Sequence, residues 1–219
     1  MKNIKAIIFD MDGVLVDSEP IHEKAEIQTC REFGIDTSNV DWNKFRGIKL
    51  KDIFSQVSKE YGKGDEPIEK MMERKVKIYL ENALQNIKLI VGVQDFLDKL
   101  KSTQKFSYAL TTSGIKVQQD KILDRFGLTG FFPIMITSDD VVKGKPDPEP
   151  YTKTVEKLGE LPENCLVIED SKNGVLSAKA AGCQVCGIEN RFFSREQLKE
   201  AGADLVITEF GELEKILFE

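Results

Sequence analysis

The fold can be traced from residues 6–15, which read AIIFDMDGVL. Four apolar residues at 6–9 are followed at once by Asp10, Asp12 and Gly13, and aspartate and glycine are common turn residues. An apolar run of this length, bounded by turn residues, predicts a short strand that is buried on both faces. The strand would therefore end on two carboxylates that lie only two residues apart.

Similar apolar runs recur along the rest of the chain, and segments with helical spacing separate most of them. The predicted strands lie at 106–110, 134–137, 165–168, 185–188 and 205–207. The predicted helices lie at 93–100, 117–126, 150–158 and 175–181. Strands that are apolar on both faces and alternate with helices predict an α/β fold, in which a Rossmann-like parallel sheet is covered by helices on both faces.

One long interval after the first strand interrupts this alternation. Helical patterns there lie at roughly 19–33, 50–61 and 66–83, and no convincing strand pattern occurs. Ser18 suits the N-cap of the first of these helices. A loop of this length without a fold of its own would be exceptional in a compact domain. We therefore predict a small all-α cap domain at 17–88, inserted after strand 1 of a core domain formed by 1–16 and 89–219.

The composition is that of an ordinary globular protein with an acidic balance. The 219 residues include 37 acidic and 31 basic ones, which gives a formal net charge of −6 and a pI near 5.1. Such a charge does not suit nucleic acid or an anionic membrane as the main partner. No stretch reaches the ~20 apolar residues of a membrane span, and Asp10 ends the first apolar run too early for a signal peptide. We expect a monomeric cytoplasmic protein whose partner is a small molecule, neither nucleic acid nor membrane.

Polar residues gather at the predicted carboxyl ends of the strands. They are Asp10 and Asp12 after the first strand, Thr112 and Ser113 after the second, Glu169 and Asp170 after the fourth, and Lys145 on the loop after another strand. In an open parallel sheet, ligands bind in the crevice beyond the carboxyl ends of the strands. The sequence therefore predicts that these side chains meet in one site.

Several carboxylates that share one site repel one another unless a cation lies among them. Two like unit charges about 4 Å apart cost about 4 kcal/mol at an effective dielectric constant of about 20. Magnesium suits a site with one or two carboxylates, a backbone carbonyl, water and a substrate phosphate. Zinc is not indicated, because the chain offers no paired histidine and cysteine ligands. We therefore predict a Mg²⁺ cofactor at this site.

These residue types fit phosphoryl transfer from a phosphate monoester, the small-molecule substrate that we expect. Asp10 could attack phosphorus and form an aspartyl-phosphate, which is a known covalent route for carboxylates. Mg²⁺ and Lys145 would offset the charge of an anion attacking a dianion, and Thr112 with backbone N–H groups would complete the phosphate cradle. Asp12 could protonate the departing oxygen and then activate water for the second half-reaction.

Four segments of the chain occur in the order of the four motifs of the haloacid dehalogenase superfamily, which the chain resembles over nearly its whole length. The segments are DMDGVL at 10–15, Thr112-Ser113, GKPD at 144–147 and EDS at 169–171. The resemblance implies that Asp10 is the nucleophile and that Asp12 is the acid/base, which also gives its carbonyl to Mg²⁺. It implies Asp170 as a further metal ligand together with Glu169, and it implies that Thr112 and Lys145 bind the phosphoryl group. The dehalogenase branch lacks the second aspartate, so Asp12 points to phosphoryl transfer.

Within this superfamily the chain looks most similar to the beta-phosphoglucomutase-like phosphatases and mutases. His22 falls where the mutase has a histidine that orients the general acid, and Lys75 falls where it has a lysine. Leu50 stands where the mutase has an arginine for the second phosphate, which counts against mutase activity. The expected substrate-binding residues are Thr112, Ser113, His22, Arg46 and Lys75.

Other interpretations of the same residues stay open at this point. Thr112 and Ser113 could cap the following helix, and Glu169 with Asp170 could be the acidic start of a helix. The charged residues of the predicted cap could simply form a solvated face. The favoured function is a Mg²⁺-dependent phosphatase of a small phosphorylated metabolite such as a sugar phosphate. The alternatives are a sugar-phosphate mutase and a non-catalytic regulator that binds a phosphorylated metabolite.

Overall fold

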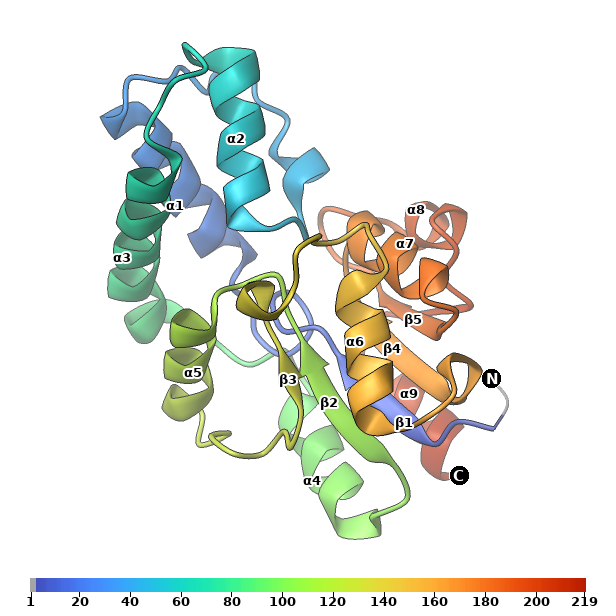
Figure 1. Ribbon diagram of the computed structural model, residues 1–219. Helices are drawn as coiled ribbons and strands as arrows, with labels where there is room; N and C mark the ends of the chain where they lie inside the picture. Colours follow the sequence, from blue (N-terminus) through green and yellow to red (C-terminus); the bar gives the residue numbers. More distant parts are fainter. Residues whose placement is uncertain (1–2) are drawn as a thin grey trace.

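A parallel sheet forms the centre of the molecule. Within residues 3–219, which the computed structural model describes, six strands pair in the order β3-β2-β1-β4-β5-β6 (Figure 1). They are β1 (Ala6–Phe9), β2 (Ser107–Thr111), β3 (Met135–Ile136), β4 (Cys165–Glu169), β5 (Gln184–Ile188) and β6 (Leu205–Ile207). All the pairings are parallel, which confirms the predicted fold class.

Helices cover both faces of this sheet because β1, at its centre, sends alternate side chains into two apolar clusters. Ile7 and Phe9 join one cluster, whereas Ala6 and Ile8 join the other. The first cluster includes residues of α4 (Val93–Thr103), α5 (Lys116–Arg125) and α9 (Phe210–Phe218). The second includes residues of α6 (Glu149–Leu158), α7 (Lys172–Ala180) and α8 (Arg195–Glu200).

The long interval after β1 folds into helices that stand above the carboxyl ends of the strands (Figure 1). These helices are α1 (Glu19–Glu32), α2 (Leu50–Tyr61) and α3 (Ile68–Asn86), with a short 3₁₀ turn at Trp42–Phe45. Their apolar side chains form a third buried cluster, made up of Cys30, Ile35, Phe45, Leu50, Ile53, Phe54, Val57 and Met71. The predicted helical insert is therefore present, and its division from the core at 17 and 88 stays our proposal.

The chain leaves the sheet and returns to it along two paired segments. The Asp17 N–H donates to the Lys88 carbonyl at 2.9 Å, and the Ile90 N–H donates to the Leu15 carbonyl at 2.9 Å. An isolated antiparallel bridge joins Val16 to residue 89 between these two bonds. The two connections between the helical insert and the sheet thus lie side by side.

Some local predictions are corrected by the structure. Ser18 does precede α1, but its hydroxyl donates to Asp12 and makes no capping bond to the helix. Helix α7 begins earlier than predicted because the Ser171 hydroxyl accepts from the Gly174 N–H and so caps it. Among residues 3–219, no helix is both long enough and apolar enough to cross a membrane.

Candidate active site

Three carboxylates meet at the carboxyl ends of β1 and β4. One oxygen from each of Asp10, Glu169 and Asp170 lies within 4.8 Å of the other two, and all three residues are buried. Gly13 makes this approach possible, since a Cβ at its position would lie 2.0 Å from an oxygen of Asp170. Its φ of +77° is also one that glycine adopts without strain. The structure therefore brings together three of the predicted site residues.

Lys145 inserts its ammonium group among these carboxylates. Its Nζ donates to Oδ1 of Asp10 at 2.7 Å and to Oε1 of Glu169 at 2.6 Å, and it lies 4.9 Å from the centre of the Tyr151 ring. Burial acts to lower the pKa of Lys145, but the two carboxylates outweigh it and raise that pKa above its usual value. Lys145 is therefore a fully charged, fixed cation.

Glu169 uses both of its oxygens to hold this arrangement. Oε1 accepts from Lys145 and, at 2.8 Å, from the Tyr151 hydroxyl. Oε2 accepts from the backbone N–H groups of Asp170 and Ser171 and from the Ser171 hydroxyl, at 3.0 to 3.2 Å. These donors tie the end of β4 to the start of α7, so Glu169 orients both Lys145 and the loop that carries Asp170.

One ammonium group does not balance three buried carboxylates. Burial raises the pKa of Asp10 and Asp170 well above the usual value, and their neighbouring carboxylates raise it further. An arrangement that lacks positive charge and offers carboxylate oxygens suits a hard divalent cation. The residues present therefore fit a metal site.

Asp12 lies in a different environment, turned toward α1. Its carboxylate accepts from the Ser18 hydroxyl, from Nε2 of His22 at 3.1 Å and from Nε2 of Gln119 at 3.3 Å. Burial alone would raise the pKa of Asp12, but His22, Ser18 and the Lys75 charge together lower it to about 2. Asp12 is thus held in its ionised form by partners that Asp10, two residues earlier, does not share.

His22 and Lys75 form a buried chain of contacts behind Asp12. Nζ of Lys75 lies 2.6 Å from Nδ1 of His22, whose ring stacks on Tyr79 with the ring centres 4.1 Å apart. An ammonium group can only donate, so Nδ1 accepts and Nε2 carries the proton that is donated to Asp12. The structure therefore places His22 in contact with the predicted acid/base and Lys75 behind His22.

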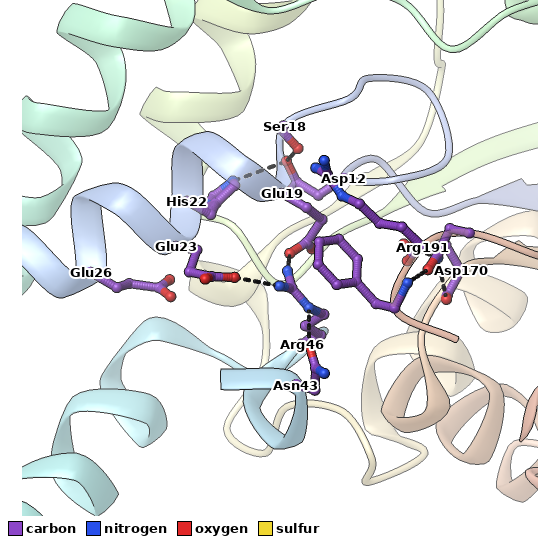
Figure 2. Close-up of polar contacts among 12 residues, drawn as sticks. Asp12, Ser18, Glu19, His22, Glu23, Glu26, Asn43, Arg46, Asp170 and Arg191 are labelled. Atoms are coloured by element: carbon purple, nitrogen blue, oxygen red, sulfur yellow. Dashed lines mark hydrogen bonds and ion pairs between the residues drawn. The ribbon is translucent and has the colours of Figure 1, made fainter. Parts of the chain in front are cut away.

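Arg46, for which a substrate contact is predicted, lines the pocket, and its guanidinium group has several partners within the protein. Its guanidinium group donates to carboxylate oxygens of Glu19 and Glu23, the latter at 2.6 Å, and to Asn43 at 3.0 Å (Figure 2). Its flat face lies 3.3 Å from the centre of the Phe192 ring in the core. All three guanidinium nitrogens are thus engaged, and Arg46 joins the cap to the core.

Thr112 and Ser113 do not cap α5, which begins after Ile115 without a side-chain cap. The capping interpretation is therefore wrong. The Thr112 hydroxyl accepts from the Gly114 N–H at 3.1 Å, and the Ser113 hydroxyl donates to the Gly47 carbonyl of the cap at 2.6 Å. Ser113 thus ties the end of β2 to the cap.

Two glutamines at the start of α5 belong to the site although no sequence motif marks them. Gln119 is fully buried and donates from Nε2 to Asp12 and, at 3.2 Å, to Oγ1 of Thr112. Gln118 is 2% exposed, and its Nε2 has no hydrogen-bond partner among the described residues. The one signal in the sequence was their place just after the polar end of β2.

The site opens into a pocket of about 70 Å³ between cap and core. Asp10, Asp12 and Asp170 line its core side, whereas Lys145, Glu169 and Thr112 do not reach it. The cap is closed over it. Nδ2 of Asn173 in α7 donates to the backbone carbonyls of Lys44 and Arg46 at 3.1 and 2.8 Å, and a Cβ on Gly47 would lie 2.5 Å from the Ser171 hydroxyl.

The parallel sheet, the carboxylate–lysine cluster at its strand ends and the helical insert are the features expected of a haloacid dehalogenase-like enzyme. The chain belongs to the haloacid dehalogenase-like hydrolases, whose family model matches residues 7–188. This membership agrees with the resemblance inferred from the four motifs.

Relatives with named activities indicate which reaction the enzyme catalyses within this family. The chain is 31% identical over 204 residues to the phosphorylated carbohydrates phosphatase of Thermotoga maritima, covering 91% of this chain and 92% of that protein. It is 32% identical over 180 residues to the phosphoglycolate phosphatase of Aquifex aeolicus, covering 82% of each. A crystal structure from Thermotoga maritima, provisionally described as a beta-phosphoglucomutase, is 29% identical with a TM-score of 0.74, covering 98% of this chain and 100% of that one. The predicted enzyme class is confirmed: the protein is a phosphatase of this family.

Proposed function

We propose that the protein is a Mg²⁺-dependent phosphatase that hydrolyses a small phosphorylated metabolite, a sugar phosphate or similar ester, through an aspartyl-phosphate on Asp10. The observation that carries this proposal is the opposite environment of two neighbouring carboxylates. Asp10 lies in the acidic cluster and contacts Lys145, whereas Asp12 is held in its ionised form by His22 and Ser18. The two carboxylates thus have separate partners, as a nucleophile beside a cation and an acid/base turned toward the leaving group require.

Asp10, Asp170 and the backbone carbonyl of Asp12 are the ligands that we propose for Mg²⁺. Glu169 was predicted as a ligand as well, but its oxygens already accept five hydrogen bonds. We therefore assign Glu169 to the support of Lys145 and of the Asp170 loop. When bound, Mg²⁺ supplies positive charge to the phosphoryl oxygens.

The residues of the chain account for both halves of the reaction. A free oxygen of Asp10 attacks phosphorus, the bond to the alcohol oxygen breaks, and that oxygen takes a proton from Asp12. Asp12 then accepts a proton from water as this water attacks phosphorus, which releases phosphate and restores the Asp10 carboxylate. Lys145 offsets the charge on Asp10 and on the phosphoryl group in both steps. We propose that Ser113, which lines the pocket, binds the same group, and that Thr112 orients the loop after β2 through its contacts with Gly114 and Gln119.

Asp12 must gain a proton before it can act as an acid. In the closed pocket a bound phosphate dianion brings negative charge close to the Asp12 carboxylate, and a like charge raises the pKa of a carboxyl group. His22 and Lys75 keep the carboxylate oriented during this change. We propose these two residues as positioning residues for Asp12, not as direct ligands of the substrate phosphate.

The related phosphatases of phosphorylated carbohydrates and of phosphoglycolate support a small phosphorylated metabolite as the substrate. The net charge of −6 supports a free metabolite over nucleic acid or an anionic membrane. We also propose that the protein acts in the cytoplasm and as a monomer.

A sugar-phosphate mutase is the second candidate. It is favoured by the buried contacts from Lys75 through His22 to Asp12 and by the likeness to the phosphoglucomutase-like structure. Against it stands Leu50, an apolar side chain on the pocket wall where a second phosphate would need a cation.

The test is phosphate release from a panel of phosphate esters, measured with Mg²⁺ and with EDTA for the wild type and Asp10→Asn. The proposal requires release by the wild type that is lost in EDTA and in Asp10→Asn, and retained in the matched control Asp120→Asn on the exposed face of α5. Mass spectrometry of the acid-quenched wild type should find a phosphate on Asp10. Conversion of β-glucose 1-phosphate to glucose 6-phosphate without net release would favour the mutase. Release that survives Asp10→Asn would overturn both.

A further inference from the structure

Helix α1 presents a row of carboxylates to the cap side of the pocket. Glu19, Glu23 and Glu26 lie four and three residues apart, which places them on one face of the helix, and all three line the pocket (Figure 2). Asp12 lines the same space from the core side. The region that must receive the leaving group is therefore rich in hydrogen-bond acceptors.

The two cations that line this region already have anionic partners. Arg46 pairs with Glu19 and Glu23, and the Lys75 ammonium lies 3.7 Å from Glu26 while it contacts His22. Among the described residues that line the pocket, none carries a positive charge without such a partner. Arg191 lies outside the lining, with its guanidinium group 3.8 Å from Asp17. An anionic group on the substrate would find repulsion here and no cation free to receive it.

Gln118 supplies the opposite kind of hydrogen-bonding group. Its Nε2 is buried without a hydrogen-bond partner among residues 3–219, although the residue belongs to the pocket wall. A buried N–H that lacks an acceptor is unfavourable, and an oxygen of a bound ligand would satisfy it. The pocket thus combines acceptors on α1 with a free donor on α5.

The rest of the cap wall is apolar. Trp42, Phe45, Ile48, Leu50 and Ile53 line it. Carbon-bound hydrogens of a ligand can pack on such a wall while its hydroxyl groups donate to the carboxylates and accept from Gln118. A chain of carbons that each carry a hydroxyl has both properties.

We propose that the cap selects phosphate monoesters whose leaving group is uncharged and carries several hydroxyl groups, that is, sugar or polyol monophosphates, and that Glu23 and Gln118 are specificity-determining residues. This inference rests on the proposed phosphatase function. It also predicts discrimination against substrates with a second phosphate or a carboxylate next to the ester. Like charges brought together at a closed site lower kcat/KM. We therefore expect kcat/KM to be about 100-fold higher for substrates with an uncharged leaving group than for those with an anionic one.

The decisive experiment compares kcat/KM of the wild type on five substrates under Mg²⁺. Sorbitol 6-phosphate and glucose 6-phosphate represent the uncharged class, and fructose 1,6-bisphosphate, phosphoglycolate and pyrophosphate represent the anionic class. The inference requires the first class to be preferred by about 100-fold. Equal or better turnover of any member of the anionic class would overturn it and leave the phosphatase function intact. Absence of Mg²⁺-dependent release from every ester, p-nitrophenyl phosphate included, would overturn the proposed function itself.

Two variants assign this preference to residues. Glu23→Gln removes one anionic partner of Arg46 and so leaves this guanidinium group freer to receive an anionic substrate. The ratio of kcat/KM between the uncharged and anionic classes should therefore fall by about 10-fold. Gln118→Leu should raise KM for sorbitol 6-phosphate by about 10-fold and leave that for p-nitrophenyl phosphate within about twofold, because only the former has hydroxyl groups to bind. Gln94→Leu, on the exposed side of α4, is the matched control. Unchanged ratios in two folded variants would exclude these residues from specificity.

Discussion

Replacing Lys145 by methionine removes the single cation that the structure places among the clustered carboxylates. The ammonium group donates at 2.7 Å to Asp10 and at 2.6 Å to Glu169, and it is 2% exposed. Methionine fills a similar space but cannot donate a hydrogen bond, so both carboxylates lose their partner in a buried environment. The variant therefore separates the charge of Lys145 from its volume.

The expected loss of stability follows from these two contacts. Breaking a buried ion pair costs about 3–5 kcal/mol, because the remaining charge is left without compensation. Two lost hydrogen bonds to charged groups, at about 1.5–3 kcal/mol each, give a similar figure. Lys143→Met is the matched control, since Lys143 pairs with Asp147 at 3.5 Å with a side chain that is 72% exposed. The control should lose about 0–1 kcal/mol.

The assay is urea unfolding of both variants and the wild type near pH 7 in EDTA, and phosphate release is measured separately with Mg²⁺. Burial already raises the pKa of Asp10, and loss of the ammonium group raises it further, so the folded variant holds a proton that the unfolded chain releases. Stability of the variant should therefore fall as the pH rises through that pKa, and its deficit should shrink in acid. The kcat should drop by about 10²–10³. A Lys145→Met protein no less stable than Lys143→Met would refute the account of the cluster.

Three further perturbations test other parts of the structure. The Glu66 carboxylate accepts from Lys63, Ser58 and Gly64, and these hydrogen bonds lower its pKa to about 2. The stability that they contribute is present above pH ~4 and is lost as the pH falls toward 2. The difference in melting temperature between wild type and Glu66→Gln should therefore vanish near pH 2. Tyr151→Phe removes one donor to Glu169 and should destabilise the protein by about 1–3 kcal/mol in urea unfolding; an unchanged midpoint would contradict this. Asn173→Ala removes two bonds that close the cap and should lower kcat/KM about 10-fold with little change in the unfolding midpoint.

The sheet was predictable because its strands are short apolar runs that end on polar residues. Both ends of β1 and β6 match the prediction, and β4 extends it only by Glu169. The short helix α8 was not anticipated, since six residues carry too little periodicity. Its capping box between Ser194 and Gln197 was the available signal.

The core of the site was predictable for a similar reason, because residues after parallel strands must meet at one edge of the sheet. The partners of Arg46 could not be predicted, since Glu19 and Glu23 lie more than twenty positions away on another element. Gln118 and Gln119 were missed because an uncharged amide in an ordinary helix carries no motif. Both are buried near the place where α3 of the cap packs against α5, and burial of this kind cannot be read from the sequence.

The pairing of the outgoing and returning segments, from Leu15 to Asp17 and from Lys88 to Ile90, has a bearing on how such a protein can change over generations. Because the two connections of the insert lie side by side, any domain inserted there needs only to have its own two termini close together. The catalytic half can then stay constant while the recognition half is exchanged, lengthened or redesigned. Grafting another lid at this junction is accordingly a natural route to a new substrate.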